Sequence, residues 1–63
     1  MADVERLREL DQRIRIARAN LRELTEQAAA FSGAEVEALS AERIARQEER
    51  LAELLKEREA AEK

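Results

Sequence analysis

Residues 28–40 read AAAFSGAEVEALS and hold Gly33, the only glycine of a 63-residue chain that has no proline. Within this segment, Ser32 and Glu35 have the S-x-x-E spacing of a capping box. In that motif the serine oxygen accepts a hydrogen bond from the glutamate amide, and the glutamate side chain accepts one from the serine amide. The segment therefore predicts that a new helix begins beside Ser32 and that the chain turns back at about 31–33.

Neighbouring residues bear on the position of this turn. Phe31 precedes the predicted cap and Val36 is the fourth residue after that cap, which are the two positions of a hydrophobic staple. Two alternatives remain open. Gly33 can instead end the first helix in a left-handed conformation, and Ser40 offers a later helix start.

Regular heptad spacing marks the first half of the chain. Apolar residues recur there in alternating steps of three and four, at Leu7, Leu10, Ile14, Ala17, Leu21, Leu24, Ala28 and Phe31. Such a series is typical of a helix that packs along its length against another helix. Continued past Phe31, the series would place carboxylates at half of its positions, so this seam does not extend into the second half.

The second half carries two apolar stripes on one predicted helix. The larger residues form a stripe that Arg58 interrupts: Ile44, Gln47, Leu51, Leu54 and Ala61. The smaller residues form a stripe that Glu48 interrupts: Ala34, Ala38, Ala41, Ala45, Ala52 and Leu55. A face this wide suits a helix that contacts two neighbours, as in a four-helix bundle, and alanines let one neighbour approach closely.

These patterns predict an all-α fold. We expect an antiparallel, coiled-coil-like helical hairpin with helix 1 over about 3–30, a turn at about 31–33 and helix 2 over about 34–61, as one domain over 1–63. The alternative is one continuous rod, because a glycine within a helix costs only about 1 kcal/mol relative to alanine. Since a lone hairpin leaves the small-residue stripe uncovered, we expect two hairpins to form a homodimeric four-helix bundle.

Larger seam residues are the expected contacts between helices and between copies. They are Leu7, Leu10, Ile14, Ala17, Leu21, Leu24, Phe31, Ile44, Gln47, Leu51, Leu54 and Leu55. Gln47 is polar, and a polar seam residue can fix register and oligomeric state at a cost in stability. Asn20 is placed to meet it across the hairpin, although both polar ends can equally reach solvent.

Composition restricts the chemistry of the chain. There is no Cys and no His, the side chains on which zinc and copper sites depend. Hydroxyls occur only at Thr25, Ser32 and Ser40, and no base can be placed beside them. We therefore predict no catalytic site, no metal, no cofactor and no enzyme activity.

Length and charge indicate the class of partner. A chain of this size buries only about 60% of the surface that its unfolded form exposes, so we expect it to gain stability from a partner chain. The net charge of −3 argues against a protein that coats nucleic acid. With no long apolar run, and no signal-peptide core in the initiator-like start MADVERLREL, we expect a self-contained cytoplasmic protein without membrane contact. Richness in arginine and alanine favours a bacterial or phage origin.

Arginines give the first helix a local positive charge. Residues 6–22 contain six arginines against two acidic residues. Four of them follow one helix face, because they recur in steps of three, four and seven: Arg8, Arg15, Arg18 and Arg22. Guanidinium groups bind carboxylate and phosphate in a forked geometry, so this stripe is a candidate contact for a polyanion or an acidic partner.

The arginine stripe has three interpretations. Pairing within the molecule is the first, because Glu9 with Arg13 and Asp11 with Arg15 are i,i+4 pairs and the second helix is acidic. An acidic protein and a nucleic acid are the others.

We predict a non-catalytic protein-interaction or scaffolding module that acts as a small oligomeric bundle. The alternative is an RNA- or DNA-binding regulator that uses the stripe.

Overall fold

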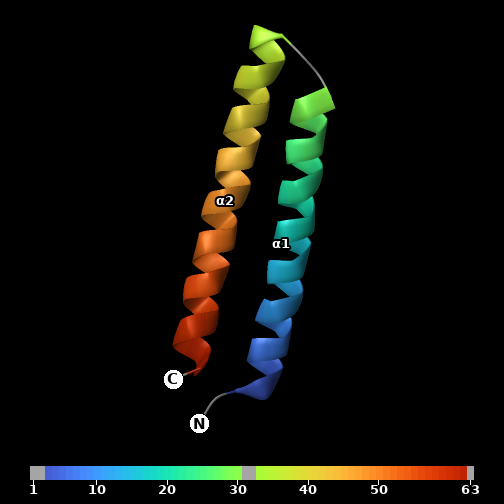
Figure 1. Cartoon of the computed structure of the whole chain (residues 1–63). Coiled ribbons are helices and arrows are strands. Elements are labelled where there is room, and N and C mark those ends of the chain that lie inside the picture. The colour runs from blue at the N-terminus through green and yellow to red at the C-terminus, as the bar shows by residue number, and fades with distance from the viewer. Residues whose placement is uncertain (1–2, 31–32, 63) are drawn as a thin grey trace.

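The computed structural model of the chain consists of two long helices joined by a short turn. It describes residues 3–30 and 33–62, except for the side chains of 34–36. Helix α1 spans Val4–Ala30 and helix α2 spans Ala34–Glu62. The helices lie side by side and antiparallel, with both termini at the same end, and the described ranges contain no strand (Figure 1). The expected all-α antiparallel hairpin is confirmed.

The length of the molecule excludes the continuous rod. Its Cα atoms extend 50 Å along the longest axis and 14 and 9 Å along the other two. An unbroken helix of the whole chain would span about 95 Å at 1.5 Å per residue. The hairpin is therefore a single layer of two helices, about half the length of a rod.

Gly33 is the last residue of the turn before α2. Its φ of +140° is a backbone conformation that residues with a Cβ rarely adopt. Its carbonyl accepts a hydrogen bond from the Glu37 amide at 2.9 Å, which is the first bond of the helical series. The lone glycine therefore permits the backbone geometry with which the chain enters α2.

Other residues of the predicted turn lie outside the description. Phe31 and Ser32 are not among the described residues, and neither are the side chains of Glu35 and Val36. The serine capping box and the hydrophobic staple therefore stay predictions. The same holds for Phe31 as a seam residue.

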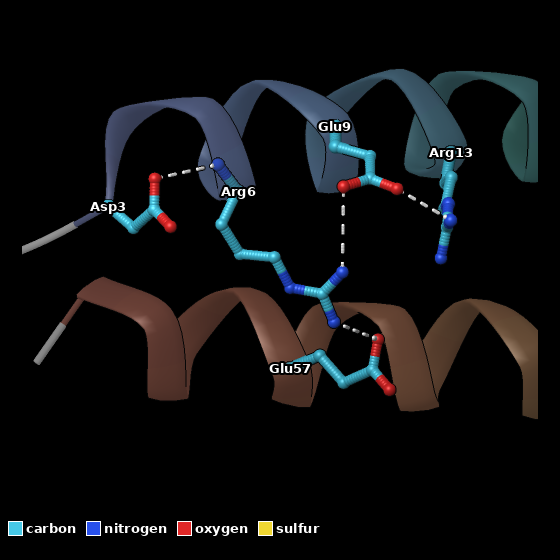
Figure 2. Close-up of polar contacts among 5 residues, drawn as sticks. All are labelled: Asp3, Arg6, Glu9, Arg13 and Glu57. Carbon is cyan, nitrogen blue, oxygen red and sulfur yellow. Dashed lines mark hydrogen bonds and ion pairs between the residues drawn. The ribbon is translucent and has the colours of Figure 1, made fainter.

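Asp3 caps the start of α1. Its Oδ1 accepts a hydrogen bond from the Arg6 amide at 3.2 Å (Figure 2). Its carbonyl accepts one from the Leu7 amide at 3.0 Å. This cap satisfies amides that the first helical turn leaves unpaired, and the carboxylate lies at the positive end of the helix dipole. The cap was not predicted from the sequence, although an Asp directly before the helix is the expected signal.

Core packing is concentrated in the half of the hairpin nearer the termini. Among the residues whose side chains are described, the buried ones are Leu10, Ile14, Ala17 and Leu54. Two partly buried residues, Leu51 and Ala61, pack against them. The predicted seam residues closer to the turn are only half-buried: Leu21, Leu24, Ile44 and Gln47. Leu7, the predicted seam residue nearest the termini, is half-buried as well. Burial is therefore greatest around Leu10, Ile14, Ala17 and Leu54, and it is lower toward the turn and at the very end of the hairpin.

Replacement of the glycine tests the turn. We predict that Gly33→Ala lowers the free energy of unfolding by roughly 1–2 kcal/mol, because alanine is strained at positive φ. No atom lies within 4 Å of the added Cβ, so the cost comes from the backbone. In an unbroken helix the same change would raise stability by about 1 kcal/mol. Thermal unfolding followed by circular dichroism shows whether Gly33→Ala lowers or raises the stability, and a rise in Tm would contradict the hairpin.

Ala19→Gly is the control for that experiment. Ala19 is exposed in the middle of α1, so its replacement reports the ordinary helical cost of glycine, about 1 kcal/mol. Gly33→Ala and Ala19→Gly should both destabilise the protein, although they exchange the same two residues in opposite directions.

Truncation of a buried leucine tests the core. Leu54 is 2% exposed and Leu39, on the same helix, is 49% exposed. We predict that Leu54→Ala costs about 2–4 kcal/mol, most of the stability that so small a core supplies. Leu39→Ala should cost less than about 1 kcal/mol. Both variants exchange leucine for alanine within α2, so their helix propensities change equally. Urea unfolding measures the free energy of unfolding of each, and equal losses would contradict the described packing.

Candidate functional site

One flank of the hairpin carries both the arginine stripe of α1 and the small residues of α2. A groove lined by Asp11, Ile14, Arg18, Leu55 and Arg58 joins the two helices on this flank. By helical periodicity, the other arginines of the stripe lie on the same side of α1 as Arg18, and the alanines lie on the same side of α2 as Leu55. We call this surface the arginine–alanine face, consisting of Arg8, Arg15, Arg18, Arg22, Ala38, Ala41, Ala45, Ala52 and Leu55.

Every member of the arginine–alanine face is exposed. Leu55 is 40% exposed, so this expected interface residue lies outside the seam within the hairpin. Val4, which is 57% exposed, occupies the same side of α1, four residues before the first arginine of the face. The face is therefore a shallow surface with small side chains along α2 and long cationic side chains along α1.

The opposite flank carries a second groove with a mixed polar and apolar lining. Its lining residues are Arg13, Ile16, Ala17, Asn20, Gln47, Arg50 and Leu54, and it continues toward the turn beside Glu23, Leu24 and Gln27. Gln47 is half-buried and Asn20 is exposed, and the two line both parts of this groove. The structure thus brings the two polar residues together at the rim of the seam.

Ion pairs cross between the helices near the termini. Arg6 contacts Glu9 of its own helix at 3.7 Å and Glu57 of α2 at 3.9 Å (Figure 2). Glu9 also accepts a hydrogen bond from Arg13 at 2.7 Å, the i,i+4 pair expected from the sequence. All four side chains are about half-exposed, so solvent weakens each pair.

Arg58 interrupts the apolar stripe of α2 because it bonds across the hairpin. Its Nε donates to Asp11 of α1, and its Nη1 donates to Glu62 one turn further along α2. The hydrogen bond from Arg58 lowers the pKa of Asp11 below its ordinary value, and the charges of Arg58 and Arg15 act in the same direction. The carboxylate in turn raises the pKa of Arg58. Asp11 therefore hydrogen-bonds to α2 instead of forming the expected pair with Arg15.

No side chain of the arginine stripe is neutralised by a close ion pair in the described part of the molecule. The ion pairs found within residues 3–30 and 33–62 use other arginines: Arg6, Arg13, Arg46 and Arg58. Arg15 influences Asp11 only through its charge. Pairing within one chain thus accounts for the arginines around the stripe and leaves the stripe facing solvent.

The described residues hold no cluster typical of a metal site and no helix that could cross a bilayer. Among them, no three acidic side chains lie close enough together to hold a metal ion. Neither helix has an apolar segment that could cross a bilayer over its described length. Comparisons with protein-family models, curated proteins and solved structures find no match to this chain. The arginine–alanine face, whose arginines are exposed and belong to none of the ion pairs among the described residues, is the candidate functional site.

Acid titration tests the Asp11–Arg58 bond. The pKa of Asp11 is lower in the folded chain than its ordinary value of 3.8. Its contribution to stability is therefore fully present above pH 3.8 and is lost as the pH falls through the lower folded value. We predict that the Tm of the wild type drops more between pH 5 and pH 2 than the Tm of Asp11→Asn, which lacks this titration. Equal drops would contradict the bond.

Proposed function

We propose that the chain is a non-catalytic protein-interaction or scaffolding module that acts as a homodimeric four-helix bundle. The observation that carries this proposal is the large surface of the single hairpin. Its accessible surface is 5136 Å², whereas a compact monomer of the same mass exposes about 4,100 Å². The hairpin therefore exposes an excess of roughly 1,000 Å² relative to a compact fold.

This excess is similar in size to what a stable interface covers. A standard protein interface removes about 800 Å² from each partner. Burial of one flank by a second chain would give the hairpin the surface of an ordinary folded protein. It would also compensate for a core with few fully buried side chains, which supplies little stability by itself.

The chemistry of the exposed side chains supports binding rather than catalysis. The chain has no Cys and no His, and its serines and threonine have no neutral-pH base beside them in the sequence. Nucleophilic and general-base catalysis at neutral pH depend mostly on such groups. We likewise propose a cytoplasmic location.

Sedimentation equilibrium and in-line small-angle scattering test the dimer. The expected result is a mass of two chains with a longest dimension close to that of one hairpin, since the bundle pairs hairpins side by side. A monomer mass at a protein concentration of about 100 μM would overturn the homodimer. The dissociation constant would then exceed about 100 μM, which is a free energy of association weaker than about −5.5 kcal/mol. A dimer twice as long would contradict the bundle.

Exposed arginines favour a second candidate function, an RNA- or DNA-binding regulator. Its supporting observation is that Arg8, Arg15, Arg18 and Arg22 face solvent outside the ion pairs of the described residues. Fluorescence anisotropy with mixed-sequence RNA at about 50 mM salt tests it, because binding through several arginines weakens steeply as salt rises. Absence of binding at low salt would exclude this candidate.

A further inference from the structure

We propose that the arginine–alanine face binds the same face of a second copy of the chain. In this arrangement α1 of each hairpin lies over α2 of the other, and the two turns are at the same end of the bundle. The inference rests on the proposed homodimer and specifies the surface and the orientation by which it forms. It follows from the small side chains, the charges and the levels of the residues on the face.

Small side chains on α2 leave space for the arginines of a second α1. Ala41, Ala45 and Ala52 are exposed and extend no further than Cβ. The long apolar stems of arginines can lie across such a surface while the guanidinium groups reach its edge. Leu55 adds apolar area in the same row and is the largest apolar side chain that the second copy would cover.

Two acidic residues occur on the same side of α2, one within the row of small residues and one just beyond its end. Glu48 follows Ala45 by three residues, and Glu59 follows Leu55 by four, so helical periodicity places both on the face. Both are exposed, and neither belongs to an ion pair found among the described residues. One face therefore offers unpaired cations on α1 and unpaired carboxylates on α2.

Cations and carboxylates of the face lie at matching positions along the helix axes when two faces meet. We call residues level when they lie at the same position along these axes, and the Asp11–Arg58 bond shows that these two residues are level across the hairpin. Because the helices are antiparallel, Arg8 is level with a residue within one turn of Glu59. For the same reason Arg18 is level with a residue within one turn of Glu48.

A twofold axis parallel to the helices keeps each residue of the second copy at its own level. It therefore brings Arg8 of one copy to Glu59 of the other and Arg18 of one copy to Glu48 of the other, twice per dimer. Every such pair joins unlike charges, and partial burial between two hairpins would strengthen these pairs relative to exposed ones.

The other symmetric arrangement is opposed by charge. A twofold axis across the helices would place α1 over α1 of the second copy, with the turns at opposite ends. The two arginine stripes would then face each other, and like charges at an interface cost several kcal/mol.

A nucleic acid would accept the arginine stripe but would meet the carboxylates of α2 on the same face. A second copy instead provides opposite charges for Arg8, Arg18, Glu48 and Glu59 together.

Charge reversal tests the face. One variant carries Arg8→Glu with Arg18→Glu, and the other carries Glu48→Arg with Glu59→Arg. Each alone should weaken self-association by about 100-fold or more, because every pair becomes one of like charges. An equimolar mixture should recover a dimer mass, because each variant then meets the opposite charge. Circular dichroism of each variant verifies that the hairpin remains helical.

The matched control is Arg43→Glu with Arg50→Glu. These two arginines are exposed on the other flank of α2, and their replacement changes the net charge by the same amount as the first variant. The control should leave the dimer intact. If it weakens the dimer as much as the first variant does, net charge explains the loss and the face assignment is wrong.

A distance measurement tests the orientation. Ala60 is exposed near the end of α2, and the chain has no native cysteine, so Ala60→Cys takes a single spin label. Turns at the same end predict a label separation below about 30 Å, whereas turns at opposite ends predict about 40 Å, from helix spacing and rise. The longer distance would overturn the proposed orientation.

The outcomes separate this inference from the proposed function. A wild-type monomer overturns both. A wild-type dimer whose mass is insensitive to the charge reversals retains the proposed function and overturns the face. Loss of RNA binding in the arginine variant, with the dimer unchanged, would assign the stripe to nucleic acid and overturn the inference as well.

Discussion

Packing between two helices in a single layer is the constraint on which the rest of the structure depends. Each helix of such a layer can bury only the stripe that faces its neighbour, so most side chains remain on one of the outer surfaces. Leu10 and Leu54 are almost fully enclosed, and the seam residues toward the turn are not. The apolar contact between the helices is therefore short, and the ends of the hairpin rely on other interactions.

Polar interactions act where that contact is weak. Near the termini, Asp3 caps α1, while Arg6 and Arg58 bond to carboxylates of the facing helix. At the other end the helices are held by the covalent turn, whose last residue, Gly33, has a conformation suited to glycine. Both kinds of interaction fix the relative position of the helices, and neither requires the apolar area that a two-helix layer lacks.

Much of the fold could be predicted from the sequence because its signals are local. Heptad spacing reports which side of a helix is apolar, and the glycine interrupts that spacing, so helix, turn and helix can be recognised along the chain. The Asp11–Arg58 bond could not be predicted in this way, since the partner of a charge depends on the register between helices. Local spacing favoured Arg15 for Asp11, and the residue on the facing helix is the one that bonds to it.

The candidate site was only partly predictable for the same reason. The arginine stripe and the alanine stripe are each visible in the sequence, but their location on one flank depends on how α1 and α2 are rotated against each other. Arg18 and Leu55 line one groove, which establishes that rotation. Both stripes then become parts of a single surface with cations on one helix and small side chains and carboxylates on the other. Residues that do not contribute to the seam are thus arranged as complementary halves, and this complementarity is what a self-associating face requires.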